Sequence, residues 1–188
     1  MEKIILLLFI LVCLAACVEN ESVIEGKVPN ASYDSEIVYL VPVKNPTKKT
    51  VDSTLIRNGS FRFNVKPKKQ NQIYIIRVKP LLRLKLQEIL VIPEPGTIQV
   101  NLDLRSSASG TPLNQTLQQW KERKEVLDSI YTSLYRVSRK ETDETMKNQL
   151  QTQMDRTLNE SRAYADSLAE KNKENALGRF LQSLRANN

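Results

Sequence analysis

The spacing of apolar positions along the chain changes near Gly110. Before this residue, β-branched and aromatic side chains alternate with polar ones in short runs that turn residues separate. After it, apolar side chains recur at alternating steps of three and four, which is the helical period. We therefore expect an α+β fold, with an antiparallel β-sandwich over residues 22–110 and a helical region over residues 111–188.

About seven strands are predicted in the first part. The best-defined pair flanks Asn58-Gly59, because this dipeptide accepts the positive φ angles of a type I′ hairpin turn. Phe61, Phe63 and Val65 alternate with polar residues after the turn, so their side chains are expected to face the core. The predicted strands cover residues 22–28, 36–43, 50–57, 60–65, 72–78, 86–92 and 97–104.

The second part predicts a long helical hairpin and a short third helix. Thr111 is a candidate N-cap, with Pro112 at the first helical position. The link near residues 139–143 contains no glycine or proline, so one continuous helix is the alternative to a hairpin. The first ladder of apolar residues is Leu113, Leu117, Trp120, Leu127, Tyr131 and Leu134, and the second is Met146, Leu150, Met154, Leu158, Ala165 and Leu168. The third helix carries Leu177, Phe180, Leu181 and Leu184 at the spacing i, i+3, i+4, i+7.

The N-terminal residues show a different pattern. An apolar run over residues 4–14 follows Lys3, and small residues then precede Cys17. The run is shorter than the roughly 20 residues that a membrane-spanning helix needs, so residues 1–16 are predicted to be a signal peptide. Cleavage between Ala16 and Cys17 would leave Cys17 to carry the acyl chains, such as palmitate, and residues 17–21 as a lipidated tether. An ordinary secretory signal with an incidental cysteine is the alternative.

The composition excludes most catalytic chemistry. The chain has no histidine, and its two cysteines are Cys13 in the signal peptide and Cys17 at the anchor. Without a free thiolate the processed protein cannot exchange disulfides, and without histidine it lacks the commonest general base and zinc ligand. We therefore predict that the protein is not an enzyme, and that it has no catalytic residue, metal site or cofactor.

The net charge of +7 survives processing, because Glu2 and Lys3 cancel. A basic surface can meet anionic lipid head groups or an acidic partner, although a solvated surface is the simpler interpretation. Tyr74 is the one aromatic residue between Lys66 and Lys85, so nucleic acid is not expected as a partner. The basic residues are Lys44, Lys48, Lys49, Lys66, Lys68, Lys69, Lys79, Arg83 and Lys85.

Two other groups of residues have structural interpretations. Glu141, Asp143 and Glu144 form an acidic cluster where a helix N-terminus favours negative charge, so catalysis is not expected there. Trp120 lies on an apolar ladder, which favours core packing over a ligand groove.

Several short segments, taken together, resemble one known family in order and spacing. They are residues 52–54, 58–63, 92–96 and 109–114, with residues 174–178 extending the resemblance into the helical region. They are similar to the β-rich domain of unknown function that precedes the thioredoxin-like domain in Bacteroidota lipoprotein thiol–disulfide oxidoreductases. The family's catalytic Cys-x-x-Cys lies in that following domain. We expect the thioredoxin domain to be absent here, so the resemblance implies no redox residue.

Two functions are compatible with the sequence. The preferred one is a non-enzymatic, lipid-anchored cell-envelope module, on the outer membrane facing the periplasm, that binds an envelope protein or glycan. Its candidate partner surface is the stripe of Leu177, Phe180, Leu181 and Leu184, unless that stripe folds back onto the hairpin. The alternative is an accessory or substrate-side portion of a thiol–disulfide oxidoreductase system whose thioredoxin domain is separate or lost. The oligomeric state is not predicted.

Overall fold

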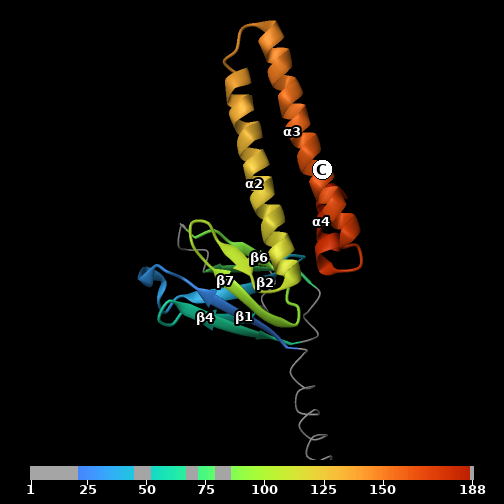
Figure 1. Ribbon diagram of the computed structural model, residues 1–188. Helices are drawn as coiled ribbons and strands as arrows, with labels where there is room; N and C mark the ends of the chain where they lie inside the picture. The colour runs from blue at the N-terminus through green and yellow to red at the C-terminus, as the bar shows by residue number, and fades with distance from the viewer. Residues whose placement is uncertain (1–20, 45–51, 67–71, 79–85, 187–188) are drawn as a thin grey trace, which may run out of the picture. The chain divides into compact units, whose positions relative to one another are not determined.

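The computed structural model describes residues 21–44, 52–66, 72–78 and 86–186. The predicted signal peptide and Cys17 lie outside these residues, and so do most residues of the basic stretch, namely Lys48, Lys49, Lys68, Lys69, Lys79, Arg83 and Lys85. The chain divides into two compact units, Met1–Gln115 and Thr116–Asn188. Within the described residues, eight strands are followed by three α-helices, which confirms the predicted α+β fold (Figure 1).

The strands form two sheets of four. The first sheet has the order β4-β1-β7-β8 and the second the order β3-β2-β5-β6. Their bounds are β1 Ser22–Lys27, β2 Ile37–Pro42, β3 Asp52–Leu55, β4 Ser60–Val65, β5 Tyr74–Val78, β6 Ile89–Val91, β7 Gly96–Asn101 and β8 Ser107–Ser109. Two details differ from the sequence prediction. β1 and β7 run parallel, and β8 was missed because its sequence, Ser-Ala-Ser, has no apolar alternation.

The core of this unit lies between the inward faces of the two sheets. Phe61 and Phe63 are buried while Arg62 between them is exposed, as the alternation predicts. Gly26 stands opposite Phe61 on the neighbouring strand. A Cβ atom on Gly26 would lie 1.9 Å from the Phe61 ring, so only glycine leaves room for that ring. The core also includes Ile24, Val38, Leu40, Ile76, Ile98 and Val100.

The predicted turn at Asn58-Gly59 is present. Asn58 and Gly59 have φ angles of 52° and 67°, and the main chains of Arg57 and Ser60 exchange hydrogen bonds of 2.8 and 3.0 Å. Pairing across the turn stops at this single bridge, because β3 joins the second sheet and β4 the first. The turn is therefore a corner between the sheets, and it places both strands at sheet edges.

A clasp of buried polar groups joins the turn before β7 to the start of the first long helix, α2 (Pro112–Ser138). Asn114 is fully buried, its Oδ1 accepts from the Ile92 N–H at 2.9 Å, and its Nδ2 donates to the Ile92 carbonyl at 2.7 Å and to Thr111 Oγ1 at 2.8 Å. Glu94 Oε1 accepts from the Leu113 N–H at 2.8 Å and the Asn114 N–H at 3.3 Å. The clasp satisfies helix N–H groups that have no partner within the helix.

The helical unit is a hairpin rather than one long helix. α2 ends at Ser138 and α3 spans Glu144–Lys171. The acidic cluster builds the connection, since Glu141 Oε1 accepts from the N–H groups of Thr142 and Asp143, and Asp143 caps α3 by accepting from the Met146 N–H. The cluster therefore has the structural role that the sequence indicates.

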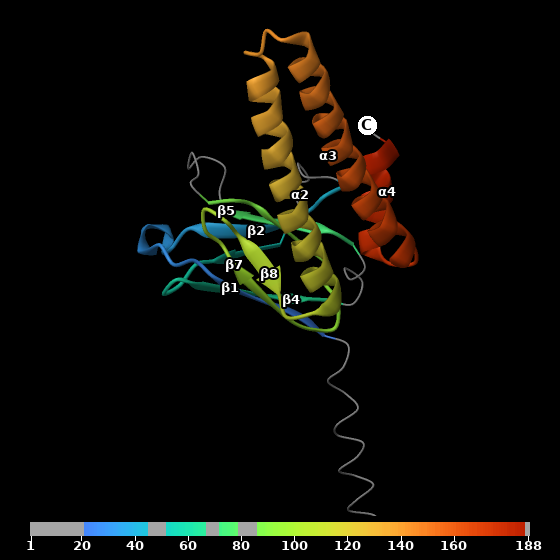
Figure 2. The same cartoon turned by 45° about the horizontal axis from the view of Figure 1, so that its top comes forward.

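The third helix, α4 (Ala176–Ala186), follows α3 closely (Figure 2). Asn175 Oδ1 accepts from the N–H groups of Leu177 and Gly178 at 3.0 and 3.3 Å, which caps the helix. A Cβ atom on Gly178 would lie 2.1 Å from the carbonyl oxygen of Asn172, so glycine permits this tight connection. None of the helices in the described part of the chain is long and apolar enough to cross a bilayer.

Candidate functional site

The stripe on α4, which the sequence offers either as a partner surface or as a segment folded back onto the hairpin, is partly buried within the helical unit. Leu177 is 0% exposed and Leu181 is 3% exposed. Phe180 packs edge-on against Trp120, with ring centroids 5.9 Å apart. Leu184 is 36% exposed and Phe180 is half-buried, so both of these members of the stripe reach solvent in part. The stripe folds back within the helical unit, and Trp120 packs in the core as expected.

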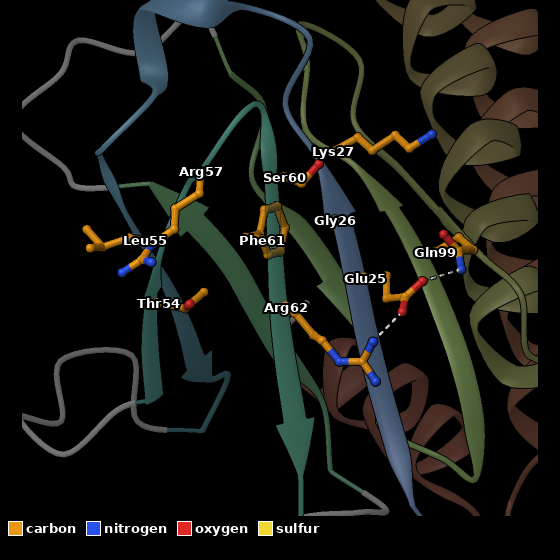
Figure 3. A pocket seen from close by; sticks show the side chains of 10 residues that line it. All are labelled: Glu25, Gly26, Lys27, Thr54, Leu55, Arg57, Ser60, Phe61, Arg62 and Gln99. Atoms are coloured by element: carbon orange, nitrogen blue, oxygen red, sulfur yellow. Dashed lines mark hydrogen bonds and ion pairs between the residues drawn. The ribbon is translucent and has the colours of Figure 1, made fainter.

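A better candidate is an open groove of about 520 Å³ in the sandwich unit (Figure 3). It runs beside β4 and is lined by residues of β1, β3, β4 and β7, together with Arg57 at the corner between the sheets. β1, β4 and β7 are far apart in the sequence and meet because β1 lies between β4 and β7 in the first sheet. β3 belongs to the second sheet and reaches the groove through the corner at Arg57.

A row of polar side chains crosses one side of the groove. Glu25 stands in register with Arg62 on one neighbouring strand and with Gln99 on the other. Arg62 Nη1 lies 2.6 Å from Glu25 Oε1, and Gln99 Nε2 donates to Glu25 Oε2 at 3.3 Å (Figure 3). The pair is solvent-exposed, so it contributes only about 0–1 kcal/mol to folding. Within the groove, the carboxylate of Glu25 therefore already has two partners, Arg62 and Gln99.

The rest of the groove combines cationic and apolar surface. Lys27 and Arg57 are exposed, and neither forms an ion pair with any residue that the structure describes. Phe61 lines the groove from the core side, and Leu55 is 42% exposed. Three cationic side chains and one carboxylate leave the lining with a net charge of +2. Such a surface is suited to an anionic partner that also carries apolar side chains.

The main chain of β4 adds hydrogen-bonding groups to the groove. The Val28 N–H donates to the Gly59 carbonyl on the side of β1, whereas Ser60 bonds Arg57 on the other side. Successive residues of a strand direct their N–H and C=O groups to opposite edges, so those of Arg62 and Asn64 point to the outer edge of the sheet. Beyond Ser60, no strand among the described residues pairs with that edge.

The shifted pKa values lie away from the groove. Burial raises the pKa of Tyr74, and the negative charge of Asp52 raises it further. Burial lowers the pKa of Lys121, against the opposing effect of Glu125. In the described segments, no three His, Cys, Asp or Glu side chains come together to hold a metal ion.

The sequence did not single out this groove. Alternation placed Arg62 on the face opposite the core, but Arg62 and Gln99 lie 37 and 74 residues from Glu25. No local pattern shows that three such residues share one register across three strands. The detectable signal was limited to the polar positions that alternate with core residues in each strand.

The sandwich is also the part of the chain that comparison with known proteins identifies. Residues 22–117 match the model of a family described as Domain of unknown function (DUF4369). No curated protein and no solved structure matches the chain. The matched range begins at β1 and ends just after the clasp around Asn114, so it contains the whole groove. The match confirms the predicted resemblance to a domain of unknown function.

Proposed function

Because this chain belongs to the DUF4369 family, whose function is unknown, we propose that it is a non-enzymatic binding module, anchored by lipid to the cell envelope. The groove beside β4 carries the proposal, since it combines positive charge, apolar surface and main-chain groups at a sheet edge. These features suit the retention of a partner. The chain has no histidine and no cysteine after Cys17, which supports a role without acid–base or thiol catalysis.

The proposed anchor is Cys17. Two or three acyl chains, each methylene contributing about 0.8 kcal/mol, would make attachment effectively permanent. The tether of residues 17–21 spans at most about 17 Å when extended, which would hold the start of β1 near the membrane surface. We place the protein on the outer membrane facing the periplasm, where its partner is an envelope protein or glycan and nucleic acid is absent.

Metabolic labelling with an alkyne analogue of palmitate tests the anchor. The wild-type protein is expected to be labelled and to sediment with membranes, and Cys17→Ala is expected to lose both properties. Cys13→Ala is the matched control, because it removes the other cysteine and leaves the acceptor intact. Labelling of Cys17→Ala at the wild-type level would contradict the proposal.

Crosslinking in living cells tests the binding role. A photoreactive residue in place of Leu55, in the groove, is expected to capture an envelope component, whereas the same residue at exposed Gln151 on α3 is not. Equal capture from both positions would contradict a role for the groove. Capture of a thioredoxin-domain protein from position 55 would instead support the alternative, an accessory part of a thiol–disulfide system. Reduction of insulin by the purified protein would contradict a non-enzymatic role.

A further inference from the structure

We propose that β4 binds an extended acidic segment of a partner polypeptide, which adds as a strand to the outer edge of the first sheet. This inference rests on the proposed binding function and names the class of partner. Strand addition needs an exposed edge, a pattern of free main-chain groups and side-chain pockets beside it. Among the residues that the structure describes, the groove beside β4 provides all three.

β4 is the longest edge strand in the described part of the sandwich. The four edge strands are β4 with six residues, β3 with four, and β6 and β8 with three each. Very short edge strands are a common protection against unwanted pairing, and only β4 lacks it. β4 also contains no proline, so every residue keeps its main-chain donor.

The charged side chain of Arg62 does not cover the outer edge of β4. Arg62 reaches across the sheet to Glu25, away from the open edge (Figure 3). Its Nε also donates to the Asn64 side chain at 3.2 Å. The outward N–H and C=O groups of Arg62 and Asn64 are two residues apart, or roughly 7 Å along the strand. This is the repeat at which an antiparallel or parallel neighbour forms its hydrogen bonds.

Charge complementarity determines the chemistry of the partner. Arg57 lies beside the outer edge of β4, Lys27 lines the groove from β1 on the inner side, and the carboxylate of Glu25 is neutralised by Arg62. An incoming strand with acidic residues on one face would place them next to Arg57, and Lys27 would attract them from across β4. Its alternate residues would point to the other face, where apolar side chains can occupy the hollow beside Phe61. The expected segment therefore alternates acidic and apolar residues.

The test uses the full chain, purified in non-ionic detergent, and a fluorescein-labelled probe peptide of seven residues that alternates glutamate and valine. Fluorescence anisotropy is expected to show saturable binding that weakens with salt. Replacing every glutamate of the probe with lysine is expected to abolish binding. Methylation of the probe's central main-chain nitrogens is expected to weaken binding about tenfold or more, because strand addition requires those donors.

Protein variants locate the binding site. Lys27→Glu and Arg57→Glu are each expected to weaken binding about tenfold, as reversal of a charge at an interface does. Arg139→Glu makes the same change in charge at an exposed position between α2 and α3, and is expected to bind as the wild type does. Equal weakening by all three variants would overturn the proposal, because it would indicate attraction to net charge alone.

Amide hydrogen exchange gives the decisive structural readout. Bound probe is expected to slow exchange at Arg62 and Asn64, whose N–H groups point outward, more than at Phe61 and Phe63. Binding without that protection, or equal binding of the methylated probe, would overturn strand addition. Concentration-dependent protection of the same amides without probe would show that the occupant is a second copy of the chain, which would also overturn the proposal. Cys17→Ala is expected to bind the probe normally, so failure of the lipid anchor and failure of this inference are separate results.

Discussion

Removal of the Asn114 side chain provides a stringent test of how the sandwich holds the start of α2. Asn114→Ala leaves the N–H and C=O groups of Ile92 without their partner, and both residues are 0% exposed. A buried polar group that loses its partner costs about 1–3 kcal/mol. Because two such groups lose their partner, we expect the free energy of unfolding to fall by about 3 kcal/mol. This is a large share of the roughly 5–15 kcal/mol that stabilises a typical domain.

The assays for this prediction are urea unfolding and amide exchange. Asn114→Ala is expected to lower the urea midpoint without changing the slope of the transition. The Ile92 amide is expected to exchange about a hundredfold faster, since every 1.4 kcal/mol corresponds to a factor of ten. Asn148→Ala is the matched control, because Asn148 is an exposed asparagine on α3. Its free energy of unfolding is expected to change by less than about 0.5 kcal/mol.

A second variant separates hydrogen bonding from charge in the same clasp. Glu94→Gln retains an oxygen that can accept from the Leu113 N–H but removes the negative charge at the helix N-terminus. The expected loss is about 0.3–1 kcal/mol, and it should shrink in high salt. The reasoning would be refuted if Asn114→Ala unfolded at the wild-type urea concentration while the Ile92 amide stayed protected.

Two further substitutions test close packing and an unpartnered hydroxyl. Gly178→Ala is expected to destabilise the helical unit by about 1–3 kcal/mol, because the new Cβ would lie 2.1 Å from the Asn172 carbonyl oxygen. Thermal melting followed by fluorescence of the single tryptophan would show this, and Gln182→Ala, at an exposed position of α4, should melt normally. Ser22→Ala is expected to raise stability by about 1 kcal/mol, since the buried Ser22 hydroxyl has no hydrogen-bond partner in the described chain. A lower urea midpoint for Ser22→Ala than for the wild type would contradict this expectation.

The features that the sequence predicted correctly are those with local causes. β4 spans Ser60–Val65, as its alternation predicts, and the turn before it follows from the conformational preference of Asn58-Gly59. α2 begins at Pro112, because proline is favoured at the first position of a helix. Asp143 in the hairpin connection caps α3. Each of these depends on residues within a few positions of one another, so the pattern carries the necessary information.

The features that the sequence missed depend on distant pairing. Nothing near β1 indicates that it lies parallel to β7, because main-chain hydrogen bonds leave no trace in side-chain identity. The helical stripe on α4 was predicted, and folding back onto the hairpin was one of its alternatives, but the sequence did not show that Phe180 packs against Trp120 of an earlier helix. The groove was missed for the same reason, as Glu25 and Gln99 come together only through the order of the strands.

The segments that carry the family resemblance and the groove have different physical roles in the structure. Asn58, Asn114 and Asn175 act inside their own units, the first by its left-handed turn conformation and the other two by bonding main-chain groups. Lys27 and Arg57 make no ion pair within the described residues, so folding depends little on their charge. A variant at Arg57 that loses binding at an unchanged urea midpoint would therefore locate a partner. Loss of binding in Asn114→Ala would come with a lower urea midpoint, so it would report a destabilised sandwich and would not locate a partner.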